Sequence, residues 1–188
     1  MNNFSGKIFV VTGPSGAGKD SVLKTAKQMG LKFGAVITTT TRAMRPGEAE
    51  ENPYYFLSRE EFETRIKNGE MIEYAEVYGN LYGNTKEELE KVAKKNEVVI
   101  IKVDPQGART YKQVFPEITT IFIQPPDFDF LEKHLVDRAT DSPEVIKKRL
   151  EVAKEELENL GQWDKIIVNY ENQLEKTAQK LLDIIQKQ

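Results

Sequence analysis

The sequence predicts an α/β protein built on a doubly wound, mostly parallel sheet. Two observations support this fold class: apolar runs of strand length, and segments with helical periodicity between them. The apolar runs are rich in β-branched residues and occur at Ile8–Val11, Glu97–Val103, Ile118–Gln124 and Lys165–Val168. Strands that alternate with helices along a chain are typical of a parallel sheet covered by helices. We expect all four runs to be buried.

Capping and stop signals place the helices between these runs. The first helix follows Gly18, carries an apolar stripe and stops at Gly30. A long helix is expected from Ser142-Pro143 to Gly161, with an apolar stripe made of Val145, Ile146, Leu150, Val152, Ala153 and Leu157. The remaining helices are expected from Asp104-Pro105 to Gln113, from Pro125-Pro126-Asp127 to near Val136, and from about Glu171 to Ile185.

A segment of different composition separates the first helix from the second strand. It contains four consecutive threonines, most of the tyrosines, and a Ser58–Glu61 capping box that starts a helix ending near Gly69. We interpret residues 36–85 as a lobe inserted into a single domain that spans residues 1–188. Residues 1–35 and 86–188 then form the core, with a short lid at about 137–148.

Composition narrows the classes of function. The 188 residues have a net charge of −3 and 30% charged side chains, which provides no basic footprint for nucleic acid or for a membrane surface. The chain lacks cysteine, a basic and apolar leader, and an apolar stretch of membrane-spanning length. These features predict a soluble, cytoplasmic protein with small-molecule partners.

The turn after the first strand matches the phosphate-binding pattern G-x-x-x-x-G-K-[ST], with one exception. Its glycines allow backbone N–H groups to surround a polyphosphate, and its lysine reaches the β- and γ-phosphates. Asp20 occupies the position of the hydroxyl that normally holds Mg²⁺, and Ser21 follows it. The motif predicts an ATP site of the P-loop NTPase type made of Gly13, Pro14, Ser15, Gly16, Ala17, Gly18, Lys19, Asp20 and Ser21.

Five basic residues are candidates for binding the phosphates in phosphoryl transfer, which depends on positioning and on positive charge rather than on covalent chemistry. Lys19 belongs to the phosphate loop, and Arg42 and Arg45 suit an acceptor phosphate. Arg138 and Arg149 bracket the polar stretch of the expected lid and could close on the transferred group. The alternative for each pair of arginines is ordinary surface charge. We take Lys19, Arg42, Arg138 and Arg149 as the catalytic candidates.

Several motifs in order resemble the guanylate kinase family over about residues 6–185. They are Gly13–Lys19, Thr40–Glu48, Tyr54–Phe56, Ile72–Ala75, Tyr82–Thr85, Val103–Ala108 and Ile167–Asn169. The resemblance implies transfer of the γ-phosphoryl group of ATP to GMP or dGMP, with Mg²⁺ accompanying ATP. It implies no nucleic-acid or membrane partner, and a monomer or a homodimer.

The resemblance also assigns roles within the inserted lobe, which would hold the nucleoside monophosphate. Residues matching the grip on the GMP phosphate are Arg42, Arg45, Tyr54 and Tyr82. Glu73 and Asp104 match the carboxylates that pair with the guanine N1–H and amine, and Thr38 matches a hydroxyl near the base. Asn84 replaces a hydroxyl residue near the GMP phosphate, and its amide can still donate.

Asp20 and Lys102 depart from the family together. Lys102 stands where an aspartate is usual, two residues before Asp104. In P-loop enzymes the loop hydroxyl and a carboxylate on a neighbouring strand hold Mg²⁺. We therefore hypothesise that Asp20 and Lys102 pair, and that ATP oxygens, water and Asp20 hold the metal. The alternative is that Lys102 points elsewhere while Asp20 only caps the helix.

Two other functions stay open at this point. Gly18-Lys19-Asp20-Ser21 also resembles the loop of ribose 1,5-bisphosphate phosphokinases, but that family lacks the guanine-reading lobe. Non-catalytic guanylate-kinase-like binding modules typically lose the phosphate loop, whose glycines and Lys19 are present here.

Overall fold

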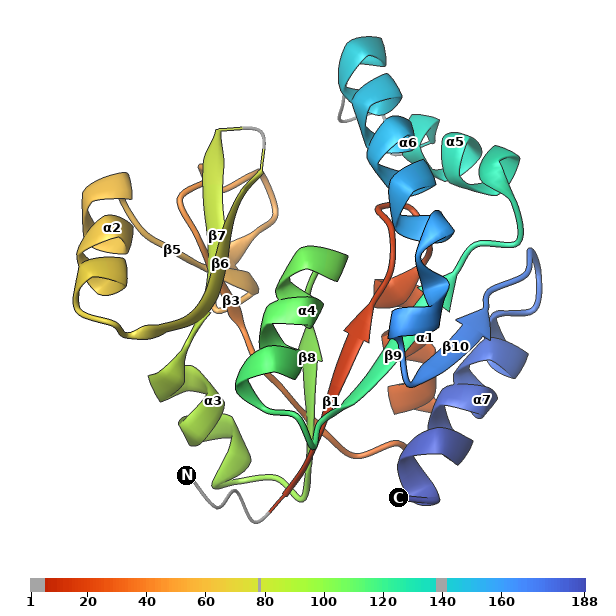
Figure 1. The fold of residues 1–188 in the computed structure, drawn as a ribbon, viewed down its shortest axis with the longest axis horizontal. Coiled ribbons are helices and arrows are strands. Elements are labelled where there is room, and N and C mark those ends of the chain that lie inside the picture. Colours follow the sequence, from red (N-terminus) through yellow and green to blue (C-terminus); the bar gives the residue numbers. More distant parts are fainter. Residues whose placement is uncertain (1–5, 78, 138–141) are drawn as a thin grey trace. The chain divides into compact units, whose positions relative to one another are not determined.

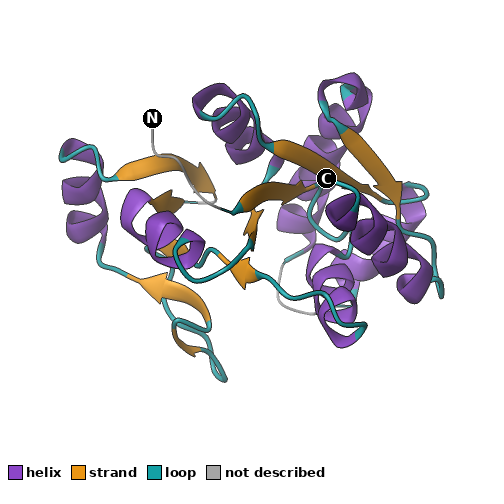
Figure 2. Cartoon of the chain, turned by 90° about the horizontal axis from the view of Figure 1, so that it is seen from below, coloured by secondary structure: helices purple, strands orange, loops and turns teal. Residues whose placement is uncertain are grey.

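The computed structural model describes residues 6–77, 79–137 and 142–188. Within these ranges the chain divides into two compact units. One contains Phe33–Ile101 and Gln106–Ile118 with the chain up to Ile8, and the other contains Phe9–Lys32, Lys102–Pro105 and Thr119–Gln188. Figure 1 labels the helices and strands, and Figure 2 shows helices and strands joined by loops.

The first sheet has the strand order β10-β9-β1-β8-β2. Its strands are β1 (Lys7–Thr12), β2 (Gly34–Ala35), β8 (Val98–Lys102), β9 (Thr119–Gln124) and β10 (Lys165–Val168). The register places β1 parallel to β9, β10 parallel to β9, and β2 parallel to β8. The predicted α/β fold with a parallel-strand sheet is confirmed.

Apolar side chains of three strands, β1, β8 and β9, form the core of this sheet. The buried members are Phe9, Val10, Val11, Val99, Ile100, Ile101, Ile121, Phe122 and Ile123. Strands buried on both faces read as continuous apolar runs, which explains why the sequence pattern found them. In such sheets, ligands bind at the carboxyl ends of the strands, where β1 and β8 end at Thr12 and Lys102.

The helices are α1 (Lys19–Gln28), α3 (Lys86–Ala93), α4 (Pro105–Val114), α5 (Phe128–Val136), α6 (Pro143–Glu158) and α7 (Leu174–Gln186). A short 3-10 turn, Leu160–Gln162, follows α6. Asp127 caps α5 by accepting a 2.8 Å hydrogen bond from the Phe130 N–H, as its sequence position predicts. None of the described helices is long and apolar enough to span a membrane.

Three expectations about the last third of the chain were wrong in detail. Ile166 of β10 is 43% exposed, because this strand lies at the edge of the sheet. Helix α6 ends at Glu158 instead of Gly161, since Asn159 leaves helical geometry, and Val152 of its expected stripe is 51% exposed. Helix α7 begins at Leu174 instead of near Glu171, after Asn172 with a left-handed φ of 55°.

The second sheet lies within residues 36–85 and has the order β4-β5-β3-β7-β6. Its strands are β3 (Thr38–Thr40), β4 (Ala49–Glu50), β5 (Pro53–Phe56), β6 (Met71–Val77) and β7 (Asn80–Thr85). Helix α2 (Arg59–Lys67) begins at the Ser58–Glu61 capping box, which forms as predicted. Its Phe62 packs with Met71 and Leu81 in a small buried cluster of this unit.

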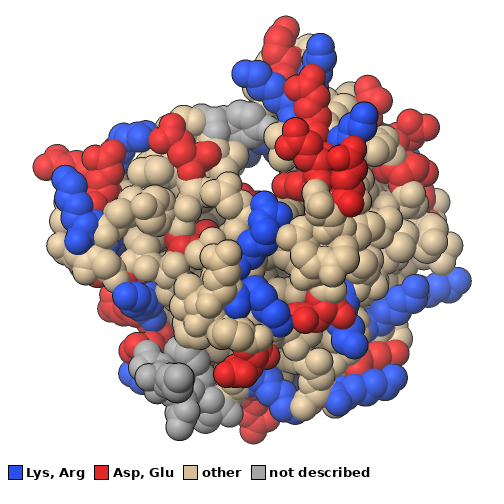
Figure 3. Space-filling model, viewed as in Figure 1, with Lys and Arg blue, Asp and Glu red and all other residues tan. Residues whose placement is uncertain are grey.

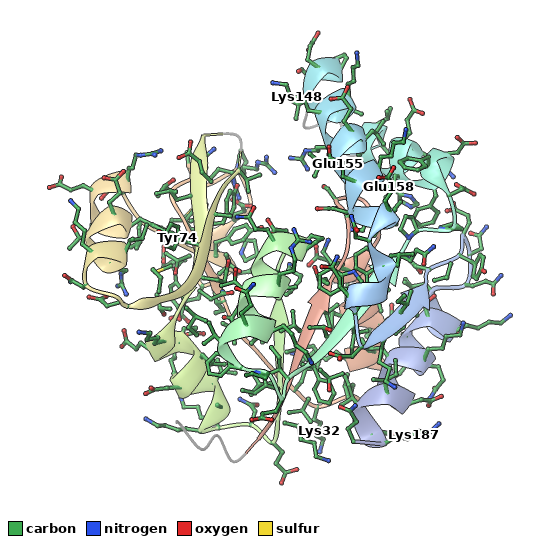
Figure 4. All side chains as sticks on the ribbon, in the orientation of Figure 1. Lys32, Tyr74, Lys148, Glu155, Glu158 and Lys187 are labelled. Carbon is green, nitrogen blue, oxygen red and sulfur yellow. The ribbon has the colours of Figure 1, made fainter. Side chains whose placement is uncertain are left out.

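Charged side chains of both signs are interspersed over the face seen in Figure 3. Helix α6 illustrates the mixture, because Lys148, Glu155 and Glu158 lie along it in Figure 4. Tyr74 of β6, labelled in the same figure, is 49% exposed. Such a mixed surface is ordinary for a globular protein.

Candidate active site

The phosphate loop connects β1 to α1 and contains three glycines with positive φ, Gly13, Gly16 and Gly18, of which the first and last also lack room for a side chain. Gly13 has a φ of 140°, and an added Cβ would lie 2.3 Å from the Ile123 carbonyl oxygen. Gly18 has a φ of 87° and stands at the N-cap of α1. Its added Cβ would lie 2.5 Å from Nδ2 of Asn169. The backbone of the loop therefore passes so close to its neighbours that side chains at these positions would displace them.

Lys19 folds back onto this loop. Its Nζ donates to the carbonyl oxygens of Gly13 at 2.5 Å and Pro14 at 3.0 Å. Burial lowers the pKa of Lys19 to about 8, although the charges of nearby carboxylates oppose that shift. The charged neighbours acting on it are Asp20, Glu156, Lys102 and Asp104. The loop thus presents a half-buried ammonium group, which a phosphate would stabilise.

Two side chains from the C-terminal part of the chain hold the loop in place. Nη1 of Arg149, on α6, donates to Oγ of Ser15 at 2.8 Å. Nδ2 of Asn169, which follows β10, donates to the Ala17 carbonyl oxygen at 3.0 Å. Arg149 therefore contacts the phosphate loop, whereas Arg138 lies outside the described residues. Asn169 belongs to a motif quoted above, but the sequence alone suggested no role for it.

The hypothesised pairing of Asp20 with Lys102 is confirmed. Nζ of Lys102, at the end of β8, forms a hydrogen-bonded ion pair with Oδ1 of Asp20 in the first turn of α1. The alternative, in which Lys102 points elsewhere, is wrong. Ser21, whose hydroxyl stands one residue after the position that the phosphate-loop pattern requires, is exposed.

This pairing bears on how Mg²⁺ fits the site. The loop hydroxyl and the strand carboxylate that hold Mg²⁺ in P-loop NTPases are replaced by the two members of an ion pair. Across the described residues, no group of three or more histidine, aspartate or glutamate side chains could hold a metal ion. The donor set therefore does not fit a metal held between loop and strand, and it fits only an ion that arrives on the nucleotide.

Arg42, which follows β3 of the second sheet, forms a cluster with Glu48, Tyr54 and Tyr82. Its Nη2 makes a bidentate contact with Glu48, at 2.7 Å to Oε1 and 2.9 Å to Oε2. Its Cζ lies 5.5 Å from the centroid of the Tyr54 ring, which packs edge-on against Tyr82 at 5.9 Å. The structure thus brings together three of the predicted phosphate-gripping residues. Arg45 is exposed on the neighbouring turn.

Glu48 orients this cluster, and sequence reasoning missed it. The hydrogen bond from the Arg42 side chain lowers the pKa of the Glu48 carboxyl most, and the hydrogen bond from the Arg45 backbone N–H lowers it further. An available signal was the spacing of Glu48, six residues after Arg42 and three after Arg45 in one turn. Glu48 keeps the guanidinium group in one place before any phosphate arrives.

A polar group in the same sheet contains three predicted GMP-binding residues: Glu73 and Thr38, expected near the base, and Asn84, expected near the phosphate. Glu73 of β6 is 6% exposed and is the register partner of Asn84 on β7, which is fully buried. Nδ2 of Asn84 donates to Oγ1 of Thr38 at 3.3 Å. Among the described atoms, Oδ1 of Asn84 has no hydrogen-bond partner. Buried acceptors of this kind suit a ligand that presents donors.

Asp104 belongs to the other compact unit, together with the phosphate loop. It is exposed, directly precedes α4, and acts electrostatically on Lys19. The proposed pairing of Asp104 with the guanine base stays a prediction.

The chain matches known proteins over nearly its whole length. The guanylate kinase family model matches residues 5–188. A guanylate kinase of Fusobacterium nucleatum is 42% identical over 181 residues, which cover 96% of each chain. One of Streptococcus thermophilus is 43% identical over 167 residues, covering 88% of this chain and 80% of that one.

A solved structure agrees with these sequence matches. The crystal structure of guanylate kinase from Anaplasma phagocytophilum superposes with a TM-score of 0.75 at 33% identity, covering 97% of this chain and 85% of the other. The phosphate loop, the Arg42 cluster and the buried Glu73 group stand within a fold and a sequence that both match this family. The chain therefore belongs to the guanylate kinase family.

Proposed function

We propose that the chain transfers the γ-phosphoryl group of ATP to GMP, giving ADP and GDP, and that dGMP is a second acceptor. Membership of the guanylate kinase family supports this activity. The observation that carries the assignment to this chain is that the buried Glu73 and Asn84, with the half-buried Thr38, belong to the same sheet as Tyr54 and Tyr82 of the Arg42 cluster. One sheet thus contains acceptors suited to a guanine base and cations suited to its phosphate.

ATP would bind with its phosphates in the loop Gly13–Ser21. Backbone N–H groups at the start of α1 and the helix dipole favour the bound anion. Lys19 would leave the carbonyl oxygens of Gly13 and Pro14 and donate to the β- and γ-phosphates. Arg149, already at Ser15, would place a second cation near the transferred group, and Arg138 a third.

The acceptor phosphate would bind at the Arg42 cluster. The guanidinium forks of Arg42 and Arg45 match phosphate oxygens, and the hydroxyl groups of Tyr54 and Tyr82 can donate. Glu48 would hold Arg42 in the correct orientation during this exchange. The phosphate would therefore meet a preorganised cation, which lowers the entropy cost of binding.

Base selection would depend on Glu73, with Asp104 and Thr38 as further contacts, whereas Asn84 would lie near the GMP phosphate. Guanine presents two adjacent donors, N1–H and the exocyclic amine, whereas adenine presents an acceptor at N1. A buried carboxylate matched to two donors would be left without them by adenine, and such a mismatch is discriminated strongly. Glu73 is buried enough, at 6% exposure, for that penalty to apply.

Catalysis would then consist of alignment and charge. With both phosphates in line, Lys19, Arg42, Arg138 and Arg149 would neutralise charge on the transferring group and exclude water. Mg²⁺ would accompany ATP and spread charge from its phosphates, held by ATP oxygens and water with Asp20 as the protein contact. We place this enzyme in the cytoplasm as a monomer or a homodimer.

A coupled assay for ADP tests the proposal with four acceptors: GMP, dGMP, AMP and ribose 1,5-bisphosphate. We expect turnover with GMP and dGMP only. Turnover with ribose 1,5-bisphosphate would overturn the acceptor assignment. Tight GMP binding without turnover would instead indicate a non-catalytic binding module.

Two substitutions on β6 sharpen this test. Glu73→Gln should raise KM for GMP at least about tenfold, since a charged hydrogen bond to the base is worth about 1.5–3 kcal/mol. Glu76→Gln is the matched control on the same strand, because Glu76 is exposed and pairs with Arg59 instead. Equal effects of the two substitutions would contradict the role of Glu73.

A further inference from the structure

The ion pair between Lys102 and Asp20 is the feature that separates this phosphate loop from the usual one. The side chain of Asp20 is 73% exposed and that of Lys102 is 32% exposed. Exposed ion pairs contribute little to the stability of a fold, because water and salt screen them. Stability of the fold therefore does not account for the pair.

Its position points to the bound nucleotide instead. Asp20 follows Lys19 in the chain, and Lys102 stands at the carboxyl end of β8. Both charges interact electrostatically with the Lys19 ammonium group, which is hydrogen-bonded to carbonyl oxygens of the loop. Lys102 is thus close enough to the phosphate loop to interact electrostatically with a group bound there.

The pair also changes the charge of the site. A neutral hydroxyl with a strand carboxylate contributes a charge of −1, whereas Asp20 with Lys102 contributes zero. ATP without metal carries two more negative charges than ATP with Mg²⁺. A site that is one unit more positive favours the metal-free nucleotide relative to the metal complex.

We propose that Lys102 is a second protein cation for the ATP phosphates, held in position by Asp20, and that it replaces the metal contact normally made by a carboxylate at this position of β8. This inference rests on the proposed function, because it assumes that ATP binds in this loop. It makes Lys102 a residue that sets the metal dependence of ATP binding. The ion on ATP would need no carboxylate from β8.

Calorimetric titration of the full chain with ATP tests the proposed role of Lys102. The titration is done without GMP, once in EDTA and once in excess Mg²⁺. The measured quantity is the ratio of the Kd in EDTA to the Kd in Mg²⁺. We expect this ratio to be at least about tenfold smaller for the unaltered chain than for the double variant Asp20→Ser with Lys102→Asp, which restores the hydroxyl and the carboxylate. Equal ratios would overturn the proposal.

The single variants test the pairing itself. Lys102→Asp alone sets two carboxylates against each other, so it should weaken ATP binding in EDTA more than the double variant does. Strictly additive effects in this cycle would overturn the coupling of the two residues. Lys32→Asp is the matched control, because Lys32 is exposed in the loop after α1, well away in sequence from the phosphate loop (Figure 4). It should leave the ratio unchanged.

Two further measurements separate this proposal from the proposed function and from misfolding. A chain that binds ATP but does not phosphorylate GMP would refute the proposed function and leave the ratio interpretable. Circular dichroism of each variant shows whether it is folded. Lys102→Gln, which removes the charge without adding another, should lose affinity mainly in EDTA. An equal loss in both buffers would contradict a cation acting on the phosphates.

Discussion

Gly18→Ala should damage the phosphate loop for two reasons that the structure separates. The first is backbone strain, because an L-residue at a left-handed φ costs about 1–2 kcal/mol, and Gly18 has a φ of 87°. The second is a clash, since the new Cβ would lie 2.5 Å from Nδ2 of Asn169. Asn169 would then give up its buried hydrogen bond to Ala17, at about 1–3 kcal/mol. The sum is about 2–5 kcal/mol.

Gly30→Ala provides the control for the strain alone. Gly30 also has a positive φ, of 102°, but an added Cβ meets nothing within 4 Å. We therefore expect this variant to lose only about 1–2 kcal/mol. Alanine also lowers the conformational entropy of the unfolded chain, which favours the folded state; this contribution is common to both variants and cancels in the comparison.

Urea unfolding of both variants measures the free energies, and titration with ATP measures the consequence for the site. Gly18→Ala should be less stable than Gly30→Ala by about 1–3 kcal/mol, the value of the lost hydrogen bond. It should also bind ATP at least about tenfold more weakly, whereas Gly30→Ala should bind it normally. Equal losses of stability would refute the reasoning, and so would unchanged ATP binding in Gly18→Ala.

Three other predictions follow from the contacts described above. Burial lowers the pKa of Lys19 to about 8, so the free enzyme loses this charge near that pH. We therefore expect kcat/KM for ATP to fall as the pH rises through about 8. A flat profile up to about pH 10 would contradict this expectation. The same lowered pKa makes the free energy of unfolding change with pH in the opposite direction to activity. Between about pH 8 and 10.5 the unfolded chain binds the proton that the folded chain has lost, so the Lys19 contribution to the free energy of unfolding rises with pH. Urea unfolding of the unaltered chain and of Lys19→Met over this pH range measures this contribution. Ser58→Ala removes the hydroxyl that accepts from the Glu61 N–H in the capping box and should cost about 1 kcal/mol in urea unfolding, without altering ATP affinity.

Local signals predicted the elements that position the phosphate loop. The buried runs at β1, β8 and β9 and the Asp127 cap depend on neighbouring residues, so they could be predicted from the sequence. The ion pair of Asp20 with Lys102 was also predicted, because the two residues depart from the family pattern with opposite charges.

Features that depend on tertiary surroundings were missed or wrong. The apolar stripe of α6 marked its less exposed face, with Ala153 buried and most of the other stripe residues half-buried, but Val152 is 51% exposed, because the extent of cover by neighbouring elements is not encoded in periodicity. Glu48 was overlooked because its role lies in a turn that brings it back to Arg42. Exposure of Ile166 reflects the place of β10 at the sheet edge, which no local pattern specifies.

The two carbonyl oxygens that hold Lys19 have a consequence for turnover. Departure of the product ADP would otherwise strip a desolvated ammonium group of its acceptors, and that loss would slow release. Here the oxygens of Gly13 and Pro14 are already within hydrogen-bond distance and can take the place of the departing phosphates. Binding and release then become an exchange of one set of acceptors for another, and the emptied loop is left ready for the next ATP.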